Sequence, residues 1–402
     1  MTIQRITRRG ILGAIGASAL AGLPGCRSGD KGSASEGSGA RRVKIGLVIP
    51  QAGVYVPLGT DLKRGWDLFL ERHGEKLGNH EVTTVVADEG DSPQSGVPAV
   101  QKVLQSDQVD VIVGVVNSAV ALGSQDSIKE AKKLLLVANA GAGAITGAAR
   151  SPYIWRTSFT NAQIASVMGQ HLAKAAAGQR VYILAPDYAA GTEVLTGFRK
   201  AFEAGGGQIA GEAKPAFGKT QDYQPFLAPI RQSGAKAVFC FFSGAEAVAF
   251  VKQYHQFGLH AELPLYGSGF LTEGSVLAAQ GEAALGIQTT LHYCAELDSP
   301  ANREFVAAYR AKYDAVPTCF SVQAWDAANV LDRALAQATA LDGDSLSKAL
   351  ASVGTIENSP RGPWSFDGQS PRQQVYLRKV EKRESGYVNA VVADLGAFSQ
   401  PA

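Results

Sequence analysis

Polar residues that could bind a ligand stand directly after a buried strand of this chain. Asn117 and Ser118 follow the apolar run 109–116, at the point where a helix is expected to begin. Free backbone N–H groups at such a helix start, together with the helix dipole, suit a carboxylate. The same two residues could instead form an ordinary N-cap, and this segment alone leaves both interpretations open.

Other candidate binding residues follow further predicted strands, in the stretches 48–56, 138–143, 187–191, 241–244 and 267–270. In an open α/β sheet, ligands bind beyond the carboxyl ends of the strands. The stretches combine aromatic and small side chains with few charges, which predicts a pocket with apolar walls for a small molecule. The candidates outside the first segment are Tyr55, Ala140, Gly141, Tyr188, Phe241, Ser243, Gly269 and Phe270.

Signatures of catalysis and of cofactor binding are missing from the sequence. The six histidines form no HExxH or other close metal pair, and neither GxSxG nor GxxxxGK[ST] occurs. The glycines of 141–147 are spaced one residue too widely for GxGxxG, and no acidic residue follows about 20 residues later. We interpret this stretch as a loop whose backbone approaches something closely. We therefore expect neither an enzyme nor a cofactor.

The elements that would position these residues alternate between apolar strands and amphipathic helices, which predicts an α/β fold with parallel sheets covered on both faces. The pattern occurs as two successive series and then continues with helices and two terminal strands. The first series has strands at 43–49, 82–87, 109–116 and 134–138, and helices at 59–72, 92–105 and 118–133. The second has strands at 181–185, 209–213, 237–242 and 263–266, and helices at 161–177, 191–204, 226–233 and 245–257. The last segments are helices at 302–313, 322–340 and 345–352 and strands at 375–380 and 387–395.

The N-terminal residues predict export to an extracytoplasmic compartment. Arg8 and Arg9 precede a short apolar run, and the stretch 23–26 (LPGC) resembles a lipobox whose Cys26 is acylated. Residues 1–26 are thus expected to be a lipoprotein signal, and 27–42 a flexible Gly/Ser-rich tether. The paired arginines resemble a twin-arginine motif, although an ordinary lipoprotein signal would also fit. The protein would then be anchored to a membrane in the periplasm or at the cell surface.

Length, charge and cysteine content set further limits. The 402 residues suffice for two domains, and the net charge of +2 argues against a nucleic-acid partner. Cys240 lies in an apolar run and is expected to be a buried strand residue. Cys294 and Cys319 could pair in an oxidising compartment, but their spacing cannot show whether the geometry fits.

Several stretches together resemble the leucine/isoleucine/valine-binding family of ABC-transporter solute receptors, from residue 43 to about 395. They include KIGLVIPQAG, VDVIVGVVNSAVAL, IWRTSFTNAQ, VYILAPDYAAGTEVL and GPWSFDG. The resemblance implies a two-lobed type I periplasmic binding protein with a mostly parallel sheet in each lobe. Lobe 1 would comprise 43–157 and 289–367, and lobe 2 would comprise 158–288 and 368–396. Three crossings between the lobes would lie near 155–159, 287–291 and 366–369.

The resemblance also assigns roles to single residues. The carboxylate-binding serine of the family falls on Ser118 and its backbone-carbonyl contact on Ala140, while the two ligand-covering aromatics fall near Tyr55 and Tyr188. The acidic residue that pairs with an amino-acid ammonium falls near Gly269, where this chain has none. A buried ammonium needs a counter-charge. Glu273 could swing inward and restore such an acid.

The expected function is therefore that of a monomeric receptor, which binds a small carboxylate between the lobes and delivers it to an ABC permease. The missing acid favours an aromatic acid, such as a benzoate or hydroxycinnamate derivative. The alternatives are a receptor of the same fold for branched-chain amino acids or amides, and a ligand sensor that acts on a signalling protein.

Overall fold

The structure is a computed structural model that describes residues 41–148, 150–175 and 178–401. The predicted export signal, the acylation site at Cys26 and the tether up to residue 40 lie outside the described residues and stay predictions. None of the helices formed by the described residues has the length and hydrophobicity needed to span a bilayer.

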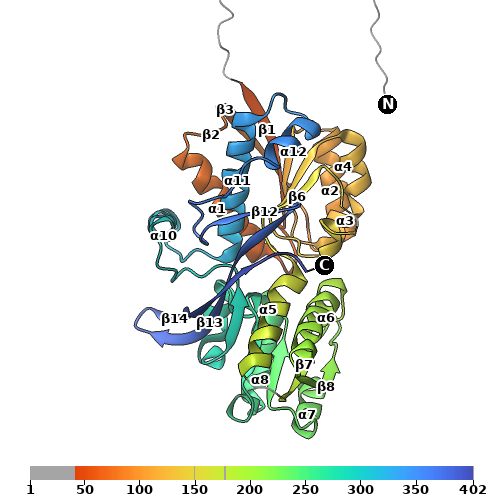
Figure 1. The fold of residues 1–402 in the computed structure, drawn as a ribbon, viewed down its shortest axis with the longest axis vertical. Coiled ribbons are helices and arrows are strands. Elements are labelled where there is room, and N and C mark those ends of the chain that lie inside the picture. Colours follow the sequence, from red (N-terminus) through yellow and green to blue (C-terminus); the bar gives the residue numbers. More distant parts are fainter. Residues whose placement is uncertain (1–40, 149, 176–177, 402) are drawn as a thin grey trace, which may run out of the picture. The chain divides into compact units, whose positions relative to one another are not determined.

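The first sheet has six strands in the order β2-β3-β1-β4-β5-β6 (Figure 1). Each neighbouring pair is parallel except β2 with β3, which is antiparallel. Its strands are β1 (Arg42–Ile49), β2 (Lys76–Leu77), β3 (His80–Asp88), β4 (Val111–Gly114), β5 (Leu134–Val137) and β6 (Ile154–Arg156). The helices that connect them are α1 (Val56–Arg72), α2 (Pro93–Gln105), α3 (Ser118–Gly123), α4 (Gln125–Ala131) and the short η1 (Gly143–Ile145). Three later helices, α10 (Pro300–Tyr313), α11 (Cys319–Gln337) and α12 (Gly343–Leu350), complete this lobe.

Both faces of the first sheet are buried, which explains its unbroken apolar strands. Ile45 and Leu47 of β1 belong to the core that also holds residues of α1 and α11, whereas Val48 belongs to the core with residues of α2 and α3. Successive side chains of a strand point to opposite faces, so each strand supplies both cores.

The second sheet has the order β12-β13-β11-β10-β9-β7-β8, with β14 paired to β13. Its strands are β7 (Arg180–Leu184), β8 (Gln208–Ala213), β9 (Ala237–Cys240), β10 (Leu265–Ser268), β11 (Gln288–Leu291), β12 (Trp364–Asp367), β13 (Ser370–Arg383) and β14 (Gly386–Phe398). Neighbouring strands are parallel along the run β11-β10-β9-β7-β8. Strands β11, β12 and β14 each pair antiparallel with β13. Its helices are α5 (Asn161–Ala175), α6 (Ala189–Ala204), α7 (Gln224–Gln232), α8 (Gly244–Gln256), α9 (Ser275–Gln280) and the short η2 (Leu259–Ala261), η3 (Gly269–Thr272) and η4 (Gly281–Ala284).

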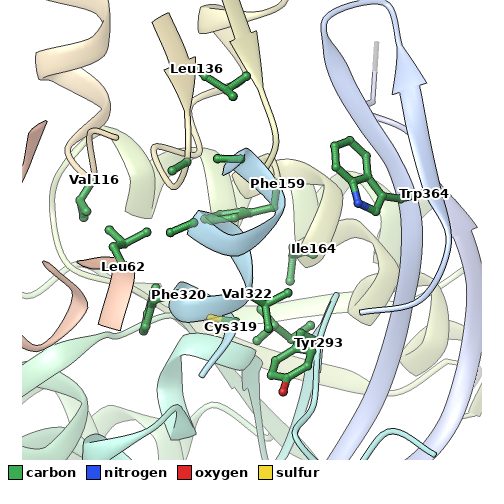
Figure 2. Close-up of a cluster of buried hydrophobic side chains, with 14 of the residues drawn as sticks. Leu62, Val116, Leu136, Phe159, Ile164, Tyr293, Cys319, Phe320, Val322 and Trp364 are labelled. Carbon is green, nitrogen blue, oxygen red and sulfur yellow. The ribbon is translucent and has the colours of Figure 1, made fainter. Parts of the chain in front are cut away.

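The chain crosses between the two sheets three times. It leaves β6 for α5, leaves β11 for α10 and α11, and returns to β12. The predicted two-lobed α/β fold is thereby confirmed. Strands β11 and β12 each pair with β13 in the second sheet. The predicted lobe limits near 289 and 367 stay a prediction. One apolar cluster includes residues of both lobes, among them Leu62, Leu136, Ile164 and Trp364 (Figure 2).

One local expectation from the sequence differs from the structure, and one possibility that the sequence left open is decided by it. The helix expected over 118–133 is divided at Ser124 into α3 and α4, where glycine and serine adjoin and weaken the helix. Cys294 and Cys319 are both free thiols and do not form the disulfide that the sequence left open. The Cys294 thiol instead donates to the carbonyl oxygen of Asn389 (2.8 Å).

Candidate ligand-binding site

A cavity of about 330 Å³ lies between elements of the two lobes. Loops and helix starts that follow parallel strands line most of it, as expected for the carboxyl edge of such sheets. Among its described lining residues, Asp91 is the one acid, and none is Lys, Arg or His. The lining residues are Tyr55, Leu58, Asp91, Ser92, Pro93, Val116, Asn117, Ser118, Ala119, Asn139, Gly141, Phe159, Asn161, Tyr188, Ala189, Ala190, Phe217, Phe241, Ser243, Phe270 and Phe320.

Most of the residues that the sequence singles out come together at this cavity. Eight of the ten candidates line it, and they are Tyr55, Asn117, Ser118, Gly141, Tyr188, Phe241, Ser243 and Phe270. Ala140 and Gly269 do not line it. Whether the eight bind a ligand remains a prediction.

Ala140 and Gly269, the two candidates that do not line the cavity, accept hydrogen bonds from buried arginines through their carbonyl groups. The Ala140 carbonyl accepts a hydrogen bond from Nη1 of Arg156, and the Gly269 carbonyl accepts one from Nη2 of Arg378 (2.9 Å). A Cβ atom at Gly269 would stand 2.5 Å from Cβ of Leu291 and 2.6 Å from Nη2 of Arg378. Position 269 therefore has no room for an acidic side chain, so the absent acid has a packing reason.

The structure distinguishes the roles of Asn117 and Ser118. Asn117 caps α3, because its Oδ1 accepts from the Ala119 N–H (2.9 Å) and its Nδ2 donates to the Asp91 carbonyl (2.9 Å). Ser118 Oγ accepts from the Ala142 N–H (3.0 Å), which leaves its hydroxyl hydrogen available. Ser118 can thus donate a hydrogen bond to a group in the cavity.

A buried carboxyl group that the sequence analysis missed binds two backbone N–H groups directly before α3. Glu89 is fully buried, and its oxygens accept from the N–H groups of Val116 and Asn117 (both 2.8 Å). Burial raises the pKa of Glu89 to about 8, against the opposing effect of these two hydrogen bonds. Its position directly after β3 is the signal that could have identified it, since the other candidates also follow strands.

Glu89 is expected to make the stability of the protein depend on pH. The folded protein keeps this proton up to about pH 8, whereas the unfolded chain loses it near pH 4.5. The folded state therefore binds more protons in that interval, and the free energy of unfolding falls by about 1 kcal/mol between pH 7 and pH 8. Urea denaturation of the wild type and of Glu89→Gln at these two pH values measures this fall. An equal fall in the variant would contradict the assignment.

Aromatic rings from both lobes form the remaining walls. The rings of Phe159 and Phe270 lie with centroids 4.7 Å apart, and Phe217 stacks on Tyr188 at 4.3 Å. Phe217 also lies 6.3 Å from Tyr55, which belongs to the opposite lobe. The sequence analysis missed Phe159, Phe217 and Phe320. Phe159 and Phe217 lie in the loops after β6 and β8, so a strand end could have signalled them, whereas Phe320 lies in α11 and is brought here by tertiary packing.

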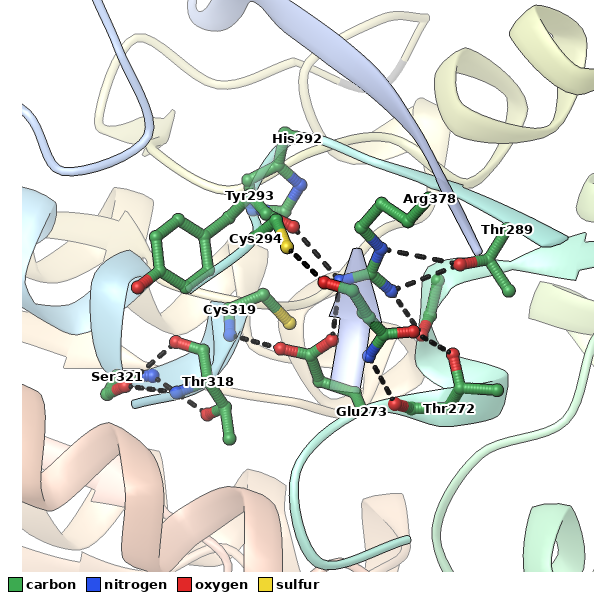
Figure 3. Close-up of polar contacts among 12 residues, drawn as sticks. Thr272, Glu273, Thr289, His292, Tyr293, Cys294, Thr318, Cys319, Ser321 and Arg378 are labelled. Atoms are coloured by element: carbon green, nitrogen blue, oxygen red, sulfur yellow. Dashed lines mark hydrogen bonds and ion pairs between the residues drawn. The ribbon is translucent and has the colours of Figure 1, made fainter. Parts of the chain in front are cut away.

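Glu273 does not supply the missing acid to the cavity. Its Oε2 pairs with Nη1 of Arg378 (2.8 Å), and its Oε1 accepts from the Cys319 N–H (2.7 Å) (Figure 3). It is buried and is not among the lining residues. An inward swing would leave the buried Arg378 without its carboxylate, which is energetically costly.

Comparisons with known proteins give concordant matches over most of the chain. Residues 42–385 match the family model described as periplasmic binding protein. The Leu/Ile/Val-binding protein homolog 6 of Brucella melitensis is 33% identical over 352 residues, which are 86% of this chain and 89% of that protein. An ABC-transporter solute-binding protein of R. palustris in complex with benzoate is 35% identical, with a TM-score of 0.81 over 89% of this chain and 98% of that one. Another, from Rhodopseudomonas palustris BisB5 in complex with 3,4-dihydroxybenzoic acid, is 32% identical, with a TM-score of 0.84 over 90% and 99%.

Proposed function

The chain belongs to the periplasmic binding protein family, and from this premise we propose that it binds a small aromatic carboxylate between its lobes. It is a solute-binding protein of an ABC transporter with the Leu/Ile/Val-binding fold. In the proposal, closure of the lobes around the ligand presents the closed form to the membrane permease. Tethering of the receptor to the membrane through an acylated Cys26 belongs to the same proposal.

The observation that carries the proposal is the division of the cavity into aromatic walls and a polar end that holds Asn117 and Ser118. Phe159, Phe241 and Phe270 form a contiguous group, with ring centroids 4.7 Å and 6.3 Å from that of Phe270. Such walls suit the faces and edges of an aromatic ring. Ser118 offers its hydroxyl to a carboxylate at the polar end. The relatives solved with benzoate and 3,4-dihydroxybenzoic acid support the same ligand class.

An amino-acid ligand is the second candidate, and Asp91 is the residue that favours it. This exposed carboxylate lines the cavity and could pair with an ammonium group. Position 269 and Glu273 cannot provide that charge, for the packing and pairing reasons given above. An exposed carboxylate remains hydrated and contributes less to binding than a buried one. The aromatic acid is therefore the better supported of the two candidates.

A thermal-shift screen distinguishes the two ligand classes. We expect benzoate, 4-hydroxybenzoate and 3,4-dihydroxybenzoate to raise the melting temperature, and leucine, isoleucine and valine to leave it unchanged. A ligand present at 100 times its Kd adds about 2.7 kcal/mol to the free energy of unfolding, which such a screen detects. Stabilisation by the amino acids alone would contradict the proposed function.

A further inference from the structure

Three arginines are almost completely buried in the part of the chain that the structure describes, and one of them differs from the others in its partners. Arg361 pairs with Asp326 (2.8 Å), and Arg378 pairs with Glu273 (2.8 Å). Arg156 is fully buried and forms no ion pair within residues 41–148, 150–175 and 178–401. A buried guanidinium stays charged, so this positive charge has no carboxylate in contact with it.

Neutral oxygen atoms accept all the hydrogen bonds that the Arg156 guanidinium donates. Nη1 donates to the carbonyls of Ala140 and Phe159, the latter at 3.0 Å. Nη2 donates to the Ala142 carbonyl (2.6 Å) and, with Nε, to Oγ1 of Thr146 (3.0 and 3.3 Å). These contacts use the five N–H donors of an arginine side chain.

The acid whose charge acts most on Arg156 does not contact it. Glu193 instead accepts from the Gly143 N–H (3.2 Å) and from Nδ2 of Asn161 (2.9 Å). It therefore offsets part of the charge from a distance, where a contacting carboxylate would offset more.

Arg156 lies directly behind a wall of the cavity. Phe159 lines the cavity, and its carbonyl accepts a hydrogen bond from Arg156. Asn139 and Gly141 also line the cavity, and they are the chain neighbours of Ala140, whose carbonyl accepts another. Arg156 itself does not line the cavity. The guanidinium is thus one hydrogen bond away from the backbone of residues that line or adjoin the cavity, in surroundings that screen its charge poorly.

The hydrogen bond to Ala140 also fixes which end of the peptide group faces the ligand. In a planar trans peptide, the N–H points away from the C=O. The carbonyl of Ala140 points at Arg156, so the N–H of Gly141, in the same peptide, points to the opposite side. This N–H donates to no acceptor within the described residues, and Gly141 lines the cavity.

We propose that Arg156 is a specificity-determining residue, which selects carboxylates that lack an amino group. It turns the Ala140 carbonyl out of the cavity, directs the Gly141 N–H into it, and adds a positive charge behind both. A ligand carboxylate would accept from Ser118 and Gly141, whereas an α-ammonium beside that carboxylate would lie near donors and a like charge. This inference rests on the proposed function, because it concerns which small carboxylate enters the same cavity.

A matched pair of ligands tests the inference on the unmodified protein. Phenylacetate and L-phenylglycine share a ring and a carboxylate, and they differ in the α-ammonium of the second. We expect calorimetric titration to give at least tenfold tighter binding of phenylacetate. Equal affinities, or a preference for phenylglycine, would overturn the inference even if no variant could be made.

Variants at position 156 then identify the source of the selectivity. Arg156→Lys, which keeps the charge, should preserve the ratio of the two affinities, whereas Arg156→Gln should reduce it about tenfold. The double variant Arg361→Gln, Asp326→Asn is the control, because it removes an equally buried guanidinium together with its own carboxylate. An unchanged ratio in Arg156→Gln, with circular dichroism showing a folded protein, would overturn the role of Arg156. Failure of every aromatic acid to bind the wild type would instead contradict the proposed function.

Discussion

Replacing Glu273 by alanine is expected to lower the free energy of unfolding by about 3–5 kcal/mol, because the change leaves a buried guanidinium without its counter-charge. Glu273 and Arg378 are 6% and 1% exposed, and their contact distance is 2.8 Å. The Arg378 guanidinium also donates to the carbonyls of Tyr293 (3.0 Å) and Gly269 (2.9 Å), so it cannot turn toward water without breaking these bonds.

The same carboxylate joins parts of the chain that are distant in sequence. Glu273 follows η3, and Arg378 belongs to β13. Glu273 also accepts a hydrogen bond from the N–H of Cys319, the first residue of α11 (Figure 3). One substitution therefore removes a link between the second sheet and a helix that packs with α1 of the first lobe. The loss should be seen as a lower midpoint of urea denaturation.

Two further variants make this prediction specific. Glu262→Ala removes an exposed partner of Arg231, with side chains that are 50% and 41% exposed, and should cost less than about 1 kcal/mol. Combining Glu273→Leu with Arg378→Met replaces both charges by apolar groups and should recover most of the lost stability. A loss in Glu273→Ala no larger than that in Glu262→Ala would show that the buried pair is not important for stability.

Ser118→Ala is expected to weaken binding of an aromatic carboxylate by about 1–3 kcal/mol, the range for a hydrogen bond to a charged group. Ser118 Oγ already accepts from the Ala142 N–H (3.0 Å), so the hydroxyl hydrogen is directed to another acceptor. The cavity is the available location for that acceptor. Titration calorimetry with benzoate measures the loss.

Ser243→Ala is the matched control for this experiment. Ser243 also lines the cavity and stands at the start of a helix, but it follows β9 in the other lobe and caps no N–H group with its side chain. It should reduce the affinity much less than Ser118→Ala. Equal affinities for wild type and Ser118→Ala would assign Ser118 only the structural role of holding Ala142.

Strand-end reasoning identified the part of the site that follows directly from chain order. Residues such as Ser118, Tyr188 and Phe270 come just after a strand, and parallel strands bring their carboxyl ends to one edge. Phe320 lies in α11, and no local pattern relates it to that edge. Its position depends on how the lobes and crossings pack, which sequence spacing does not encode.

The sequence by itself determined the α/β class, the two series of strands and helices, and eight of the residues that line the cavity. It could do so because strand and helix periodicity are local properties of the chain. Only the tertiary structure decided which buried charges find partners. Glu89 binds the N–H groups of Val116 and Asn117, Glu273 pairs with Arg378, and Arg156 binds the Ala140 carbonyl. Each of these depends on contacts between residues that the fold alone brings within hydrogen-bond distance.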